Sequence, residues 1–331
     1  MIEVDRLIKR YTVYKRVPGT LRRRREAVPA LDGLSFSVPR GSVTGFIGPN
    51  GAGKSTTVKI LSGILWPDGG SCVVGGLVPW KERKAHVKRL GVVFGQRTQL
   101  WWDLPVSDSL MLLGDMYGVA RTRRDAMIAL LVDELELGAF IETPVRQLSL
   151  GQRMRCELAA ALVHEPELLF LDEPTIGLDA PSKLALRGFV RRLNVERGTT
   201  VILTTHDMDD IDALADRVLL IGKGRALFDG TMAGLRREAG SRKRLVVDLA
   251  EPPGPELEGL TSPGAPRPGL PAELELVAHS PTRLEFSFDP ARLDAAAAIA
   301  SVAASYRAAD LSVEGQPAEE LIAALYKRHG V

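Results

Sequence analysis

The chain has 331 residues and an almost balanced charge, with 43 Lys and Arg against 41 Asp and Glu. A net charge of +2 does not favour a nucleic-acid or acidic partner, and the length allows one large or two smaller domains. Two distant cysteines, Cys72 and Cys156, exclude a disulfide scaffold and fit a reducing compartment. The N-terminus lacks the features of a signal peptide, and no stretch approaches the roughly 20 apolar residues of a membrane span. We therefore expect a soluble chain that needs another polypeptide for any membrane role.

The first forty residues predict two strands separated by a basic segment. Residues 1–12 are typical of a short strand, and residues 34–38 alternate apolar and polar side chains as a half-buried strand does. The segment 15–26 between them contains a run of arginines at 22–25. Two interpretations stay open. Blocks of like charge usually form solvated loops, but basic residues also bind anionic lipid headgroups or a partner.

The segment 48–56 is the part of the chain around which the rest is organised. It consists of Gly48, Pro49, Asn50, Gly51, Ala52, Gly53, Lys54, Ser55 and Thr56. An apolar strand pattern precedes it and a helical pattern follows it, which is the context in which GxxxxGK[ST] binds a nucleoside triphosphate. Its glycines let backbone N–H groups and the helix N-terminus approach the phosphates. Lys54 would reach the β- and γ-phosphates, and the Ser55 hydroxyl would coordinate Mg²⁺.

Short apolar runs then alternate with helical patterns up to about residue 235. The expected strands are 71–76, 90–94, 168–171, 201–205 and 218–221, and the expected helices are 106–117, 124–135 and 148–163. Ser149 is predicted to cap the N-terminus of the last of these helices. Strands that alternate with helices predict a parallel, helix-covered sheet with its site at the carboxyl ends of the strands.

The composition changes near residue 240. The expected elements there are a strand at 244–249, a proline- and glycine-rich loop at 251–271, strands at 274–278 and 283–288, and helices at 291–305 and 317–328. About ninety residues suffice for a small α/β domain. No catalytic constellation is visible in it, and a role in dimerisation, partner binding or regulation stays open.

Polar residues that follow strand ends could act on the bound triphosphate. Asp172 could hold Mg²⁺ opposite Ser55, and the next residue, Glu173, could polarise the water that attacks the γ-phosphate. His206 follows another strand and could donate to the γ-phosphate region, while Gln96 offers an amide carbonyl to the metal or the water. Each alone has an ordinary explanation, a surface turn or a locally bonded histidine, but the phosphate loop upstream favours the functional one.

Six ordered motifs within residues 1–235 resemble those of the ATP-binding subunits of ABC transporters. They are the Walker A loop at 48–55, the Q-loop residue Gln96, the signature at 148–152, Walker B at 168–172 followed by the base Glu173, the D-loop residue Asp179 and the switch residue His206. The resemblance implies an α/β, ABC-type P-loop nucleotide-binding domain. It would contain a mostly parallel core sheet, an antiparallel β part and a helical signature subdomain. The expected boundaries are 1–238 for this domain and 239–331 for a small C-terminal α/β domain.

The resemblance also implies a mechanism and partners. Two such cassettes pair head to tail around two MgATP, so that Ser149, Gly151 and Gln152 of one subunit meet the γ-phosphate held by Lys54 of the other. We expect the N-terminus of the signature helix to have no other role within one chain. Closure of the homodimer would couple ATP hydrolysis to a separate polytopic permease at the cytoplasmic face of the membrane, and no nucleic acid is expected.

Two positions depart from the family pattern or leave a choice. Leu150 replaces the first glycine of the usual LSGGQ signature, which reduces backbone freedom there. The aromatic residue that stacks on adenine in the family corresponds best to Tyr11, with Tyr14 as the alternative.

A single cassette followed by a small α/β domain resembles the ATPases of ABC-2-type exporters, and residues 95–105 resemble their viologen-exporter-like branch. Export is therefore expected rather than import. Trp101 and Trp102 have two open interpretations, as ordinary core residues or as part of a partner surface. In the family the region after the Q-loop receives a short helix of the membrane subunit, and on the second interpretation the two tryptophans would anchor that helix. The alternative is a soluble ABC ATPase acting on ribosomes or DNA, whose relatives carry two cassettes or a long coiled coil that this chain lacks. A cassette without turnover is disfavoured because the expected catalytic residues are present.

Overall fold

The computed structural model describes residues 1–16, 23–95, 97–205, 207–240, 242–250 and 270–330. Its contacts divide the chain into two units, residues 1–232 and 233–330, and each is described by itself. The helices are α1 (Lys54–Leu61), α2 (Arg83–Val87), α3 (Val106–Tyr117), α4 (Arg121–Glu134), α5 (Leu150–Leu162), α6 (Ala180–Arg197), α7 (Met208–Leu214), α8 (Met232–Ala239), α9 (Ala295–Ser305) and α10 (Ala318–Arg328). The strands are β1 (Ile2–Arg16), β2 (Arg23–Val38), β3 (Val43–Ile47), β4 (Gly69–Val74), β5 (Leu90–Phe94), β6 (Leu168–Asp172), β7 (Thr200–Thr204), β8 (Arg217–Gly222), β9 (Arg225–Gly230), β10 (Lys243–Leu249), β11 (Glu275–Ser280), β12 (Arg283–Phe288) and β13 (Ala308–Gly315).

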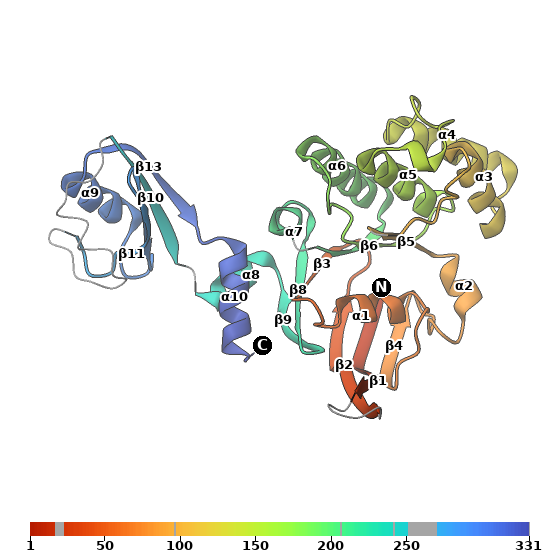
Figure 1. Ribbon diagram of the computed structural model, residues 1–331, viewed down its shortest axis with the longest axis horizontal. Coiled ribbons are helices and arrows are strands. Elements are labelled where there is room, and N and C mark those ends of the chain that lie inside the picture. Colours follow the sequence, from red (N-terminus) through yellow and green to blue (C-terminus); the bar gives the residue numbers. More distant parts are fainter. Residues whose placement is uncertain (17–22, 96, 206, 241, 251–269, 331) are drawn as a thin grey trace. The chain divides into compact units, whose positions relative to one another are not determined.

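A six-stranded sheet in the order β5-β6-β7-β3-β8-β9 forms the centre of the first unit. All neighbouring strands are parallel except β9, which runs antiparallel to β8. Every residue of β3 and β7 is buried, as expected of strands that are covered on both faces. Helices α5 and α6 lie on one side of this sheet and α1 on the other (Figure 1). The predicted parallel core is therefore confirmed, and its carboxyl ends meet at one edge.

A three-stranded antiparallel sheet in the order β2-β1-β4 covers the α1 side of the core. Its inward side chains, among them Leu7 and Leu34, join those of the central sheet in one apolar cluster. Phe36 meets Phe46 of β3 edge to face, with the ring centroids 5.2 Å apart. This is the antiparallel β part that the family resemblance implies.

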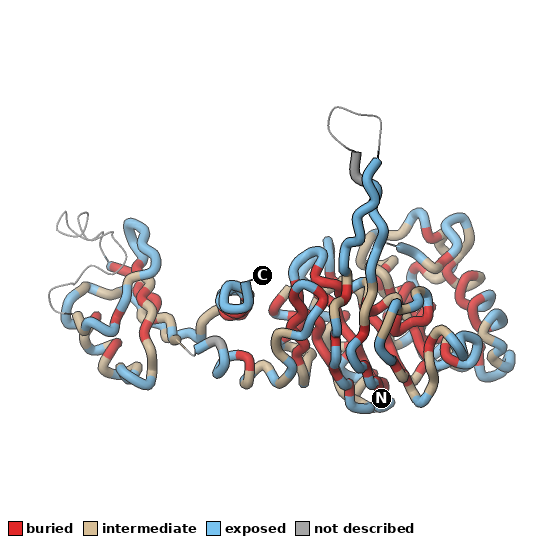
Figure 2. Tube along the Cα trace, turned by 90° about the horizontal axis from the view of Figure 1, so that it is seen from below, coloured by how far each residue is buried: buried red, intermediate tan, exposed pale blue. Residues whose placement is uncertain are grey.

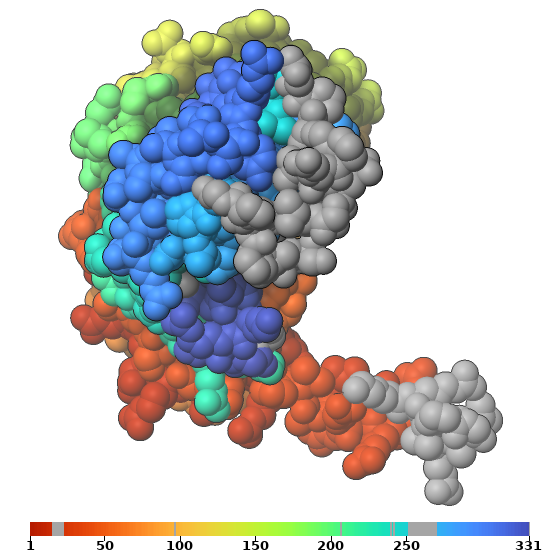
Figure 3. Space-filling view, turned by 90° about the vertical axis from the view of Figure 1, so that its left-hand side faces the viewer, coloured from red at the N-terminus to blue at the C-terminus, as the bar shows by residue number. Residues whose placement is uncertain are grey.

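The ends of β1 and β2 extend beyond this sheet as a two-stranded ribbon. Pairing with β4 ends at Ile8, whereas β1 and β2 stay paired as far as Arg16 and Arg23. The exposed ribbon projects from the rest of its unit in Figures 2 and 3. The interpretation of the basic segment as a loop is therefore wrong for residues 15–16 and 23–26, which are strands; residues 17–22 lie outside the described part.

Helices α3, α4 and α5 form a helical lobe in the first unit (Figure 1). Arg124 of α4 packs its stem against Gly114 of α3, where an added Cβ would lie 2.5 Å from it. In the part of the chain that the structure describes, no helix is both long and apolar enough to cross a membrane.

The second unit contains a four-stranded antiparallel sheet in the order β11-β12-β10-β13. Ala298 and Val302 of α9 pack against Leu245, Val247 and Phe286 on one face of this sheet. Helix α10 reaches α8 through Arg328, whose guanidinium donates to the Glu238 carbonyl at 3.0 Å. Most of the predicted elements are present, but β13 and α8 were not expected from the sequence.

Candidate functional site

The glycine-rich loop between β3 and α1 is held in a wrapped conformation. Gly53 has a φ of 110°, and a Cβ there would lie 2.7 Å from the Ala30 carbonyl oxygen. The Ala52 carbonyl accepts from the Gly224 N–H at 3.0 Å, which fastens the loop to the β8–β9 turn. Glycine is therefore required at position 53 for both conformation and space. The first N–H groups of α1 have no carbonyl partner within the helix and no side-chain cap at Gly53, as a phosphate site needs.

Lys54, the first residue of α1, lies between the loop and two carboxylates. Its ammonium donates to the Gly48 carbonyl and, at 3.3 Å, to the Pro49 carbonyl. Burial lowers the pKa of Lys54, while Glu173 and Asp172 act in the opposite direction. The fold thus brings together a cation and two acids that are more than a hundred residues apart in the sequence. This agrees with the spatial relation that the Walker A and Walker B motifs predict.

The end of β6 is fixed by Thr204, which sequence reasoning missed. The Thr204 hydroxyl donates to Asp172 Oδ1 at 2.5 Å, and its carbonyl accepts from the Glu173 N–H at 2.9 Å. Glu173 has a φ of 54°, in the left-handed region that non-glycine residues rarely adopt. The only signal in the sequence was a pair of threonines, Thr204 and Thr205, directly after the apolar run 201–203.

The signature helix α5 begins with a capping box. The Ser149 hydroxyl accepts from the Gln152 N–H at 3.2 Å, and the Gln152 amide oxygen accepts from the Ser149 N–H at 2.9 Å. The predicted cap is confirmed. The expectation that this helix end has no role within the chain is wrong, because both side chains cap it. The N–H groups of Leu150 and Gly151 lie in the first turn, where backbone N–H groups have no carbonyl partner within the helix.

Leu150 occupies an ordinary helical position, where any residue adopts the required backbone conformation. Its Cδ2 atom lies 2.9 Å from the point that a Cβ would occupy at Gly177, which precedes the D-loop aspartate. The replacement of the usual glycine therefore leaves the helix intact and places an apolar side chain against the D-loop.

Asp179 caps helix α6 and accepts from the Ser182 N–H at 3.1 Å. Its hydrogen bonds with Ser182 lower the pKa of the Asp179 carboxyl. Two other predicted residues, Gln96 and His206, lie outside the described part of the chain. Ser55 is exposed in the first turn of α1, beside Lys54. Hydroxyl and carboxylate oxygens are ligands that Mg²⁺ prefers, so Ser55 and Asp172 fit a magnesium site completed by nucleotide phosphates.

A buried carboxylate connects α7 to the segment that follows Glu173. Asp210 is fully buried and accepts from the hydroxyls of Thr175 at 2.5 Å and Thr205 at 3.1 Å. It also forms an ion pair with Arg187 of α6, with Nε 2.6 Å from Oδ1. Sequence reasoning did not single out this network, because its members come from separate parts of the chain.

The two candidate adenine-stacking residues lie on β1, three positions apart and therefore on opposite faces. Tyr11 pairs with Val28 and Tyr14 with Arg25. Since Ala30 of β2 adjoins Gly53, the strand position of Tyr11 is closer to the phosphate loop by three residues, or roughly 10 Å.

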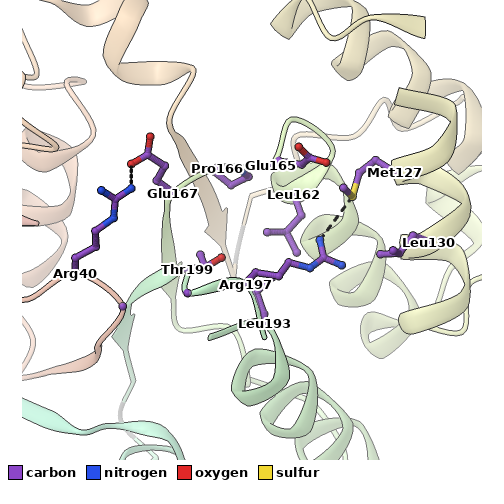
Figure 4. A pocket seen from close by; sticks show the side chains of 12 residues that line it. Arg40, Met127, Leu130, Leu162, Glu165, Pro166, Glu167, Leu193, Arg197 and Thr199 are labelled. Atoms are coloured by element: carbon purple, nitrogen blue, oxygen red, sulfur yellow. Dashed lines mark hydrogen bonds and ion pairs between the residues drawn. The ribbon is translucent and has the colours of Figure 1, made fainter. Parts of the chain in front are cut away.

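A cavity of about 760 Å³ lies at the opposite edge of the central sheet, where β6 and β7 begin. Figure 4 shows its charged lining, in which Arg40 pairs with Glu167 at 2.6 Å and Arg197 donates to the Met127 sulfur. Its described lining contains no predicted site residue, so it does not belong to the nucleotide site.

Known proteins that resemble this chain identify its family. The ABC transporter family model matches residues 31–176. A daunorubicin resistance ATP-binding protein of Streptomyces coeruleorubidus is 42% identical, over 66% of this chain and 68% of that protein. A daunorubicin/doxorubicin resistance ATP-binding protein of Streptomyces peucetius is 41% identical, over 64% of each chain. The chain thus spans less than two thirds of the length of this second relative.

Solved structures agree on the fold. One from Clostridium perfringens, described as part of an ABC transporter complex, has a TM-score of 0.61 and 27% identity and covers 72% of this chain and 90% of that chain. A dimeric ATP-binding cassette solved with ADP and Pi also has a TM-score of 0.61, at 24% identity over 70% of this chain and 99% of that chain. The chain belongs to the ABC transporter family, and the relatives that it matches are ATP-binding proteins. The resemblance read from the motifs is confirmed.

Proposed function

We propose that the chain hydrolyses ATP and thereby drives export through a separate membrane subunit. The observation that carries the proposal is the position of Lys54 beside both Asp172 and Glu173, next to a loop that requires glycine. Curated relatives are named drug resistance and Nod factor export ATP-binding proteins, which supports export. No observation favours action on ribosomes or DNA.

The chemistry follows from the side chains at this edge of the sheet. Lys54 exchanges its contact with the Gly48 carbonyl for β- and γ-phosphate oxygens. Ser55 and Asp172 hold Mg²⁺, which when bound neutralises charge on the phosphates. Glu173 orients the attacking water and accepts its proton. Roles for Gln96 and His206 are proposed from the sequence alone.

Adenine recognition is assigned to Tyr11. Its place on β1 is closer to the phosphate loop than that of Tyr14, and its ring is partly exposed, at 38%. An aromatic ring can stack on the face of any purine, because stacking does not recognise the hydrogen-bonding edges of the base.

The complete site requires a second copy of the chain. Ser149, Gly151, Gln152 and Asp179 of one subunit would approach the γ-phosphate held by the other. The open first-turn N–H groups of α5 support this arrangement, because a helix N-terminus attracts anions. In one structure of the same fold, the cassette is dimeric with ADP and Pi.

The membrane subunit is proposed to bind beside Trp101 and Trp102, which are 38% and 50% exposed. The Trp101 carbonyl accepts from the N–H of Leu104, and Leu104 lines a groove of about 620 Å³ with Met111 and Leu112 of α3. The groove is also lined by charged side chains, those of Asp108, Asp115, Arg121 and Arg124. An amphipathic helix of the permease would therefore fit it. The chain would then lie peripherally at the cytoplasmic face of the membrane.

Affinity purification from detergent-solubilised membranes of the source tests the transport part of the proposal. A polytopic membrane protein should be recovered with the chain, and the double variant Trp101→Ala/Trp102→Ala should lose it. Val195→Ala, at an apolar side chain that is 75% exposed on α6, serves as the control and should retain it. Recovery with ribosomes or DNA, or with no membrane protein, would overturn the transport claim.

A further inference from the structure

Apart from Tyr11, the β1–β2 ribbon is a surface to which the proposed nucleotide site assigns no residue. Beyond Ile8 the two strands pair only with each other, and every described side chain at 10–14 and 23–29 is exposed. Figure 2 shows this exposed stretch extending out of its unit, and Figure 3 shows the same projection from another side. Neither face of the ribbon packs on the apolar core.

Strand β2 exposes three adjacent positive charges on the ribbon. Arg23, Arg24 and Arg25 are consecutive and exposed, and Arg25 lies opposite Tyr14 rather than opposite an acid. Like charges repel, and an isolated two-stranded hairpin is marginally stable in water. An anionic partner would remove this repulsion, so the ribbon fits an anionic surface.

The positive charge is local to the ribbon. The whole chain is almost neutral, yet strand residues 9–16 and 23–28 hold only one acid, Glu26, among their many Lys and Arg side chains. Tyr14, 62% exposed and opposite Arg25, adds an aromatic ring with a polar tip. Such rings favour the headgroup level of a bilayer, and guanidinium groups pair well with phosphates.

We propose that the β1–β2 ribbon binds the anionic lipid headgroups of the membrane that holds the partner subunit. The proposal rests on the proposed function, which places the chain at a membrane. Basic side chains near an anionic leaflet are attracted over about one Debye length, so the ribbon would hold and orient the chain there. An acidic segment of the partner protein is the competing occupant.

The test uses the full chain and sedimentation with vesicles of phosphatidylcholine, with or without added phosphatidylglycerol. Binding should require phosphatidylglycerol and should weaken as salt increases. The triple variant Arg23→Gln/Arg24→Gln/Arg25→Gln should bind about a hundredfold more weakly, at about fivefold for each arginine. Tyr14→Ser should weaken binding without changing its dependence on salt.

The control removes the same charge from another exposed stretch, in the variant Lys81→Gln/Arg83→Gln/Lys84→Gln. It should bind vesicles like the unmodified chain. Equal losses in the two triple variants would show that only net charge matters and would overturn the proposal. Equal binding to neutral vesicles would overturn it as well.

ATP hydrolysis without vesicles separates this proposal from the proposed function. The triple arginine variant should hydrolyse ATP at the unmodified rate, since Arg23, Arg24 and Arg25 are not part of the nucleotide site. An unmodified chain without hydrolysis would refute the proposed function and leave the vesicle result valid. If vesicles are not bound but the arginine variant loses the membrane subunit in detergent, the ribbon contacts protein and the lipid proposal is wrong.

Discussion

The carboxylate of Glu157 on α5 accepts a hydrogen bond from the hydroxyl of Thr98, just after the Q-loop position. The same carboxylate accepts from the Gln99 N–H at 3.2 Å, and the Gln99 side-chain amide donates to the Glu157 carbonyl at 3.2 Å. Glu157 is only 3% exposed. The segment that leads to Trp101 is thus tied to the helix that begins with the signature.

Replacing Glu157 with Gln should lower the free energy of unfolding by about 1–3 kcal/mol. The amide has one acceptor oxygen where the carboxylate has two, so that either the Thr98 hydroxyl or the Gln99 N–H would lose its acceptor in a buried place. Urea unfolding measures the change. Glu136→Gln is the matched control, because its side chain is 85% exposed and its ion pair with Arg155 is a surface pair. A loss no larger than that of the control would contradict the stabilising role of Glu157.

Glu157 also predicts a dependence of stability on pH. Burial raises the pKa of its carboxyl above the ordinary 4.5, although Thr98 and Gln99 oppose the shift. At a pH between 4.5 and the raised pKa of the folded chain, the Glu157 carboxyl is ionised in the unfolded chain and protonated in the folded chain. The contribution of this group is therefore fully present below about pH 4.5 and is lost as pH rises through the folded pKa.

The difference in unfolding free energy between the chain and its Glu157→Gln variant, measured against pH, reports this group alone. The stability of the chain relative to the variant should fall as pH rises from 4.5. A difference that rises with pH would mean that the hydrogen bonds outweigh burial.

Local patterns predicted the elements better than they predicted the site. Residues 90–94 and 106–117 match β5 and α3, since apolar periodicity is set by the buried face of each element. Ser149 was predicted because a helix cap is local chemistry. The ribbon at 23–26 was missed because a run of arginines does not resemble a half-buried strand.

Thr204 and Asp210 show what the sequence could not reveal. Thr204 acts on Asp172 across two neighbouring strands, and Asp210 joins groups from α6, from the residue after β7 and from the segment after β6. Such relations depend on which strands become neighbours, and the spacing of one chain does not contain that information. The motifs identified the Walker residues from the sequence alone. The side chains that hold these residues in place could be identified only from the folded structure.

Arg187→Ala should destabilise the chain by about 3–5 kcal/mol, because it leaves the fully buried Asp210 carboxylate without its ion-pair partner. Arg192→Ala, on an exposed position of the same helix, should change stability little. In the double variant Arg187→Met/Asp210→Leu, removal of both charges should restore part of the loss. Thermal and urea unfolding measure all three, and equal effects of the two arginine variants would refute this role of the pair.

Thr204→Val should lower the apparent affinity of the site for Mg²⁺, because it removes the hydroxyl that orients Asp172 and leaves the metal ligands themselves in place. Loss of a partner that orients a metal ligand typically costs 10–100-fold in metal affinity. The Mg²⁺ concentration for half-maximal hydrolysis should rise by about that factor, with a smaller effect on the rate at saturating Mg²⁺. An unchanged Mg²⁺ dependence would contradict the role of Thr204 in orienting Asp172.

The roles of Lys54 and Glu173 are separated by one pair of variants. Glu173→Gln should keep nucleotide binding and lower the hydrolysis rate by about 10²–10⁴-fold, because an amide cannot accept the proton of the attacking water. The closed dimer should then persist in the presence of ATP. Lys54→Ala should instead weaken nucleotide affinity, since Lys54 supplies the ammonium that contacts the phosphates. Equilibrium binding of a fluorescent ATP analogue and phosphate release measure the two effects. Normal turnover in Glu173→Gln would exclude Glu173 as the base, and unchanged affinity in Lys54→Ala would exclude Lys54 as the phosphate ligand.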